Sequence, residues 1–149
     1  MNLAEFDRIF IKEMHRWGVP TLRVTLGIVF LWFGALKLIG ASPVANLIAE
    51  TYSFLPADLF LAVLGYWEIA IGLGLLLNFA LRTTLALLWL QMFGTLASPL
   101  FNPELFFQNG NIFLLTTEGE FVVKNLVLIA ASLVIGGYGV RAMDSSQKS

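Results

Sequence analysis

Four long apolar stretches limit the folds that this sequence can adopt. They run from Thr21 to Ile39, Asp58 to Phe79, Thr83 to Leu100 and Phe121 to Tyr138. Each has about the 17–25 residues that a helix needs to cross a bilayer. The chain of 149 residues is 13% charged, against roughly 25% in soluble domains. We therefore predict an all-α integral membrane protein, a four-helix transmembrane bundle that forms a single domain over residues 1–149.

Basic residues gather at one end of these predicted spans. Arg8, Lys12, Arg16 and Arg23 precede or open the first span, Arg82 separates the second from the third, and Arg141 and Lys148 follow the fourth. The other two connections contain acidic residues but no lysine or arginine. Lysine and arginine favour cytoplasmic segments. We therefore expect a multi-pass protein of the bacterial inner membrane with both termini in the cytoplasm.

The first 20 residues form a distinct amphipathic segment. Phe6, Ile9, Phe10 and Trp17 share one helical face, with charged residues opposite. This pattern is typical of a helix that lies in the membrane interface, and a helix that docks on a partner has the same pattern. We predict an interfacial helix over residues 1–20, and not a cleavable signal peptide, because charged residues occur throughout it.

The second outer connection, from Phe101 to Glu118, is rich in aromatic residues. It contains the turn signal Asn109-Gly110. We expect this loop to fold over the outer mouth of the bundle as a lid, through a short helix from Pro103 or a hairpin about Asn109-Gly110. The lid residues would be Phe101, Phe106, Phe107 and Phe113.

Small and polar residues recur at helical spacing within each stretch and predict its inward face. The small residues are Gly27 and Gly34 in the first stretch and Gly65 and Gly72 in the second. Small side chains let membrane helices approach closely, so these four glycines are the predicted helix-packing positions.

Glu68 lies near the middle of the second apolar stretch. An ionised carboxylate at the bilayer centre costs at least about 2.5 kcal/mol unless it is paired, so it needs a partner. Lys37 and Lys124 lie on predicted inward faces and are the candidate partners. The predicted buried polar cluster consists of Lys37, Glu68, Gln91, Glu120 and Lys124.

This cluster has two interpretations. Glu68 and one lysine could form a structural ion pair that fixes helix packing and binds nothing. Alternatively, two lysines facing one carboxylate would leave positive charge in excess, which favours an anionic or carbonyl-bearing ligand such as a quinone head group or a lipid phosphate. Glu120 discriminates between them, because its pairing with Lys124 would remove that excess.

Other sites are disfavoured by composition. The chain has no cysteine and hence no disulfide, thiolate metal site or thiol redox couple. Its single histidine, His15, lies outside the apolar stretches, which argues against haem or a multi-histidine metal centre. No basic cluster suits nucleic acid. We predict neither a metal site nor a catalytic residue, and redox chemistry would need a bound cofactor, such as a quinone, or a partner.

Two segments resemble a known family. The run from Arg23 to Gly40, with Phe30, Gly34 and Lys37 at F-x-x-x-G-x-x-K spacing, and the run Gly65-Tyr66-Trp67-Glu68 resemble the DoxX family of small four-helix membrane proteins. The segment from Glu118 to Ala130 resembles its YkgB- or RclC-type branch of reactive-chlorine-resistance proteins. The resemblance implies a membrane protein, linked in some members to thiosulfate:quinone oxidoreduction or to oxidative-stress complexes.

Three functions remain open, in order of preference. The first is a non-catalytic accessory subunit of a membrane redox or oxidative-stress system that holds a quinone or lipid head group at the polar cluster. The second is a quinone-dependent oxidoreductase subunit completed by a soluble partner. The third is a small transporter or proton-coupled channel that uses Glu68. Expected partners are the lipid bilayer, subunits of a membrane redox complex and a second copy of the chain.

Overall fold

The computed structural model describes residues 3–146, and the side chains of residues 3 and 5–139. Residues 1 and 2 of the predicted interfacial segment, the side chain of Arg141 and all of Lys148 lie outside these residues. The long helices are α1 (Leu3–Leu38), α3 (Ala57–Leu76), α4 (Leu81–Ala97) and α6 (Asn125–Ser146). Shorter helices fill the connections, namely α2 (Ala45–Thr51), η1 (Ser98–Leu100), η2 (Pro103–Leu105), η3 (Gln108–Gly110) and α5 (Thr117–Val123).

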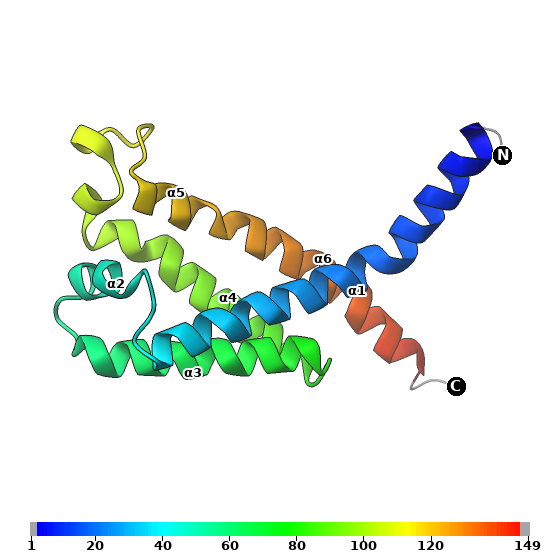
Figure 1. The fold of residues 1–149 in the computed structure, drawn as a ribbon, viewed down its shortest axis with the longest axis horizontal. Helices are drawn as coiled ribbons and strands as arrows, with labels where there is room; N and C mark the ends of the chain where they lie inside the picture. Colours follow the sequence, from blue (N-terminus) through cyan, green and yellow to red (C-terminus); the bar gives the residue numbers. More distant parts are fainter. Residues whose placement is uncertain (1–2, 147–149) are drawn as a thin grey trace.

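Four helical segments in the described residues are long and apolar enough to cross a membrane. They are Glu5–Leu38, Ala57–Leu76, Leu81–Leu100 and Thr117–Gly139. The predicted all-α, four-span fold is confirmed. α1 begins and α6 ends at the same end of the bundle, and α2 lies at the other (Figure 1). We call the end with α2 and η1–η3 the loop end.

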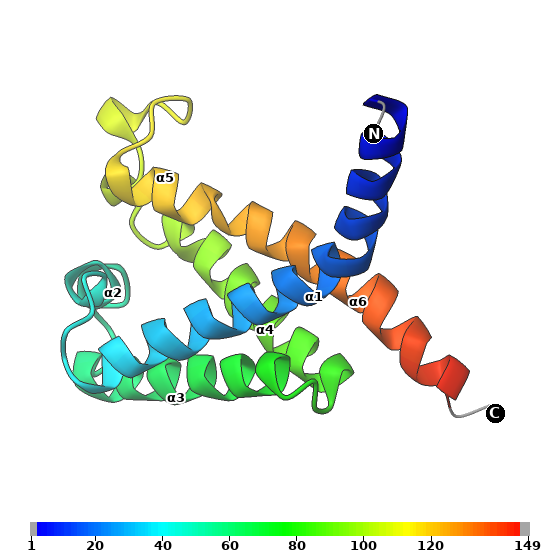
Figure 2. The ribbon, with the colours of Figure 1, turned by 45° about the vertical axis from the view of Figure 1, so that its right-hand side comes forward.

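α1 is one continuous helix that includes both the predicted interfacial segment and the first span. Its first part leaves the bundle at an angle, in both views (Figures 1 and 2). Pro20 lies inside α1, and proline bends helices because it lacks a backbone N–H and its ring crowds the preceding turn. Phe6, Ile9, Phe10 and Trp17 are each 53–56% exposed. Their placement in the membrane interface stays a prediction.

α1 and α3 are in direct backbone contact through glycines. A Cβ atom added to Gly72 would lie 2.6 Å from the backbone nitrogen of Leu31 and 2.8 Å from the carbonyl oxygen of Gly27. A Cβ atom on Gly34 would lie 2.6 Å from the carbonyl oxygen of Gly65. Real Cβ atoms do not approach within 3.0 Å of other atoms. The structure therefore places all four predicted packing glycines at one tight contact.

Side chains attach the remaining helices to this pair. Trp67 on α3 donates from Nε1 to the carbonyl oxygen of Leu87 on α4, at 3.1 Å. Trp89 on α4 donates from Nε1 to Ser132 Oγ on α6, at 2.7 Å. Arg23 on α1 donates to the carbonyl oxygens of Leu75 and Leu76 at the C-terminal end of α3. The helix dipole makes this end negative, so it stabilises the arginine cation. Between the helices joined by these hydrogen bonds lies an apolar core, which includes the buried residues Leu26, Ile71, Leu75, Leu88 and Ile135.

The aromatic loop combines both predicted conformations. η2 begins at Pro103, and Asn109 and Gly110 adopt left-handed conformations with φ of 52° and 70°. The chain then returns, and Phe107 and Leu115 form an isolated antiparallel bridge. A short helix and a hairpin-like turn therefore occur in succession.

Candidate functional site

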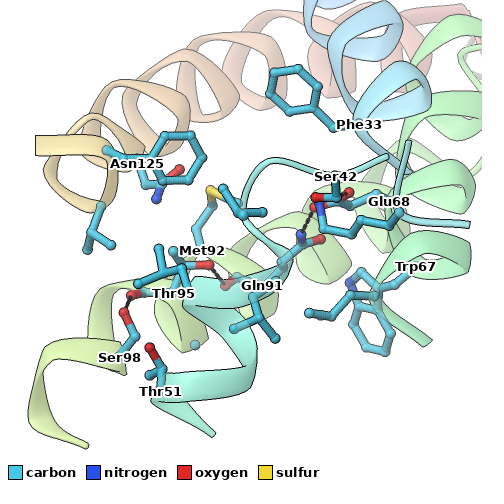
Figure 3. Close-up of a pocket in the computed structure, with 18 of the residues that line it drawn as sticks. Phe33, Ser42, Thr51, Trp67, Glu68, Gln91, Met92, Thr95, Ser98 and Asn125 are labelled. Atoms are coloured by element: carbon cyan, nitrogen blue, oxygen red, sulfur yellow. Dashed lines mark hydrogen bonds and ion pairs between the residues drawn. The ribbon is translucent and has the colours of Figure 1, made fainter. Parts of the chain in front are cut away.

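A cavity of about 530 Å³ lies at the loop end, between α1, α2, α3, α4 and the α5–α6 segment (Figure 3). Its volume falls within the roughly 300–1,000 Å³ of small-molecule sites. Most of its wall is apolar and includes Phe30, Leu64, Trp67, Met92 and Phe106. The cavity therefore offers a site in which apolar surface can be buried away from water.

The polar end of this cavity is built around Glu68. One carboxylate oxygen of Glu68 lies 2.7 Å from Lys37 Nζ, and the other accepts a hydrogen bond of 2.6 Å from Gln91 Nε2. The side chains of Lys37 and Glu68 are only 6% and 8% exposed. Glu68 thus pairs with one of its two candidate lysines, and the pair carries no net charge where ionic groups are costly. Figure 3 shows Gln91 reaching Glu68 from α4.

Glu120 and Lys124 are not part of this buried cluster, contrary to the prediction, although Lys124 lines the cavity. Their charged groups are 3.7 Å apart, and their side chains are 73% and 63% exposed. Lys124 separates α5 from α6 but keeps right-handed helical φ and ψ of −53° and −23°, so Thr117–Gly139 is still one segment of membrane-spanning length. Glu120 and Lys124 lie in the first two turns of this segment, at the loop end, where other helices do not cover their side chains. The expected excess of positive charge is therefore absent from the buried pair.

Three buried polar atoms within the described residues have no hydrogen-bond partner, and all three belong to residues that line the cavity. They are Thr51 Oγ1, Gln91 Oε1 and Asn125 Nδ2. Thr51 is 5% exposed and Asn125 is 6% exposed. An unsatisfied buried polar group costs about 1–3 kcal/mol, so most such groups in native proteins have a partner. Figure 3 shows Thr51 and Asn125 on the side of the cavity away from Glu68.

Thr51 and Asn125 were not among the residues predicted from the sequence. Asn125 is an uncharged polar residue within the fourth apolar stretch, next to Lys124, and that position was a usable signal. Thr51 gave no such signal, because it ends a helix of only seven residues. Trp67, also missed, lines the cavity while its ring nitrogen bonds to α4.

The roof of the cavity differs from the predicted lid of four phenylalanines. Phe106 is fully buried and lines the cavity. Phe101 instead packs on Tyr52, with ring centroids 5.4 Å apart, and Phe113 is 86% exposed. Phe107 is partly buried and, like those two, does not line the cavity. α2 takes their place through Leu47, Ile48 and Thr51, because this helix folds over the bundle and covers the space that the loop was expected to fill.

Tyr52 fixes α2 in this position. Its hydroxyl donates to the carbonyl oxygen of Gly94 on α4, at 3.2 Å. Burial raises the pKa of the Tyr52 phenol above its ordinary value of 10.0, because the charged phenolate is poorly solvated there. The bond between α2 and α4 therefore forms from a neutral, donating hydroxyl.

The cavity has partly exposed aromatic residues at its edge. Phe33 on α1 and Phe121 on α5 both line it, and they are 44% and 41% exposed. The two helices diverge toward the loop end in both ribbon views (Figures 1 and 2). The edge of the cavity between α1 and α5 is therefore apolar.

No group of three or more histidine, aspartate or glutamate residues that could hold a metal ion occurs among the described residues. No curated protein and no solved structure gives a match to the chain. The family model of DoxX matches residues 18–100, more than half of the sequence, and this range contains Lys37, Glu68 and Gln91. The chain therefore belongs to the DoxX family.

Proposed function

We propose that this protein is a non-catalytic binding subunit that holds an amphiphile, a quinone or a lipid, in the loop-end cavity. The cavity itself carries this proposal, since it combines an apolar wall with a polar end at Lys37, Glu68 and Gln91. Apolar lining with a few placed polar groups is the usual composition of a small-molecule site. The protein would act within a membrane redox or oxidative-stress system, as the resemblance of Glu118 to Ala130 to the YkgB- or RclC-type branch suggests.

The position of the cavity edge supports an amphiphile over a water-soluble ligand. Phe33 and Phe121 border the cavity, and both lie in segments that are long and apolar enough to span a membrane. An apolar tail can pass between these two rings, while the head group remains inside the cavity. We infer that the ligand enters from the bilayer, with the loop end on the outer side.

The alternatives receive less support. A proton-coupled channel needs a carboxylate that gains and loses protons, whereas Glu68 is held by Lys37 and Gln91 at hydrogen-bonding distance. These two bonds hold the carboxylate in a fixed geometry. A quinone-dependent oxidoreductase subunit would bind its quinone in the same cavity and would differ by having a redox partner.

Copurification tests the proposal. Protein extracted in a mild detergent should retain a quinone or a lipid in stoichiometric amount, identified by mass spectrometry. The double variant Lys37→Met, Glu68→Gln removes both charges together, so no unpaired ion is left in the cavity. Its retention of the ligand should fall, because the polar end no longer matches the head group, while its helix content and thermal unfolding show that it is folded.

Lys12→Met is the matched control, because this lysine is exposed on the part of α1 that leaves the bundle (Figure 1) and does not line the cavity. It should retain the ligand as the wild type does. If the double variant and Lys12→Met both keep the wild-type amount, the polar end does not contact the ligand and the proposal fails.

A further inference from the structure

We infer that Thr51, Gln91 and Asn125 select an uncharged head group that both donates and accepts hydrogen bonds, and that they reject phosphate head groups. The inference rests on the proposed function and names the class of ligand that the same cavity takes. The observation behind it is a different one, however. Three buried polar atoms, on three different helices around one cavity, have no hydrogen-bond partner.

The orientation of Gln91 shows what the ligand has to supply. The ionised carboxylate of Glu68 can only accept hydrogen bonds, so the amide nitrogen of Gln91 has to face it, at 2.6 Å. The amide oxygen of Gln91 is then turned away, and it is buried without a partner. A carbonyl oxygen accepts only, so the group that satisfies it must donate, as a hydroxyl does.

Asn125 requires the complementary group. Its amide nitrogen is a donor, is buried without a partner, and calls for an acceptor oxygen. Thr51 contributes a hydroxyl, which can donate or accept. Figure 3 places these two residues on the side of the cavity away from Glu68. A ligand that satisfies all three atoms therefore has polar atoms at more than one position, of both hydrogen-bonding kinds.

Charge excludes the phosphate head group. Two lysines line the cavity, and each has a carboxylate beside it: Lys37 lies 2.7 Å from Glu68, and the exposed Lys124 lies 3.7 Å from Glu120. A phosphate would bring a negative charge close to the carboxylate of Glu68 with no unpaired lysine beside it. An uncompensated buried charge costs several kcal/mol. A neutral head with hydroxyl and ether or carbonyl oxygens carries no such cost.

Water is the competing occupant. A buried water molecule can satisfy two to four polar groups, and the cavity has room for several. The two occupants differ in what substitution does. If water alone bonds these atoms, replacing them has no effect on a ligand; if a ligand bonds them, replacing them weakens that ligand.

Three probes with the same ten-carbon tail test the inference on purified protein in detergent micelles. They are 5-decylresorcinol, which has two neutral hydroxyls, decylbenzene, which has no polar head, and decyl phosphate. Calorimetric titration should show the tightest binding for decylresorcinol. Thr51→Val and Asn125→Leu should each weaken decylresorcinol about fivefold, the equivalent of one hydrogen bond, and leave decylbenzene unchanged.

The same variants give a second readout in the empty protein. Replacing an unpartnered buried polar group with an apolar group of similar shape removes a desolvation cost, so Thr51→Val should raise the unfolding temperature. Thr84→Val is the matched control. Thr84 is equally buried, at 5%, but its hydroxyl donates to the carbonyl oxygen of Phe79. Thr84→Val should lower the unfolding temperature and leave probe binding unchanged.

The outcomes separate this inference from the proposed function. If decylresorcinol, decylbenzene and decyl phosphate bind equally and the variants change nothing, the cavity takes amphiphiles without selecting the head, and only the inference is overturned. If decyl phosphate binds tightest, the selection is for an anion and the inference is again wrong. If none of the probes binds the wild-type protein, both the inference and the proposed function fail.

Discussion

Gly72→Ala and Gly137→Ala should change stability in opposite directions, although both replace a helical glycine with alanine. The added methyl group at Gly72 would meet backbone atoms of α1, at 2.6 Å from the nitrogen of Leu31 and 2.8 Å from the oxygen of Gly27. To reach an ordinary contact at 3.4 Å, α1 and α3 must separate by about 0.8 Å. At Gly137 the methyl group would meet nothing within 4 Å.

The expected energies follow from these contacts. A gap of about 0.5–1 Å loses a quarter to a half of the van der Waals attraction between the atoms that separate. Overpacking costs about 1–3 kcal/mol, and Gly72 belongs at the upper limit because backbone atoms cannot rotate away. Alanine is favoured over glycine in a helix by about 1 kcal/mol, and both variants gain this amount. We therefore expect about 2 kcal/mol of destabilisation for Gly72→Ala and about 1 kcal/mol of stabilisation for Gly137→Ala.

Thermal unfolding followed by circular dichroism, in one detergent for all variants, measures the difference. About 3 kcal/mol between the two variants corresponds to about 6–12 °C for a chain of this length. The result that would refute the reasoning is an unfolding temperature of Gly72→Ala equal to that of Gly137→Ala. The helices would then tolerate a side chain at their contact, and the backbone approach would not be a stabilising feature.

Three further predictions concern the ion pair, the orientation and α2. Lys37→Met should destabilise the protein by about 3–5 kcal/mol, because it leaves Glu68 buried and unpaired. Adding Glu68→Gln to the same chain should recover most of the lost stability. If unfolding experiments show no recovery, the two charges are not coupled. An alkaline phosphatase fusion at Asn109 should be active and one after Ser149 inactive, and the reverse pattern would place the loop end in the cytoplasm. Because burial raises the pKa of Tyr52, its contribution to stability is complete below about pH 10 and is lost as the pH rises through the folded-state pKa. Tyr52→Phe should therefore lose less stability than the wild type between pH 9 and about pH 11, and equal losses would contradict this assignment.

The inward faces of α1 and α3 could be predicted from sequence because both helices are regular where they touch. Gly27, Gly34 and Lys37 follow helical spacing along α1, and Gly65, Glu68 and Gly72 follow it along α3. The four-span fold followed from the apolar stretches for a related reason, since a bilayer-length apolar run has few other structures available.

The part of the site that sequence did not predict depends on tertiary contacts. Lys124 and Asn125 both line the cavity, but other elements cover only Asn125, which is buried, while the side chain of Lys124 stays exposed. α2 covers the cavity through a contact of Tyr52 with α4, residues that are 42 positions apart in the chain. No local periodicity encodes such a contact, so the roof was assigned to the phenylalanines instead.

The glycine contact also indicates where ligand preference can change. The four glycines that join α1 to α3 have no room for a side chain, so a substitution there would separate the two helices that carry Lys37 and Glu68. α2, α4 and the α5–α6 segment have no such constraint at Thr51, Thr95 and Asn125. A mutant library that seeks an altered ligand should vary these three positions and leave the glycines untouched. Natural variants of this chain that bind different molecules should differ at the same positions.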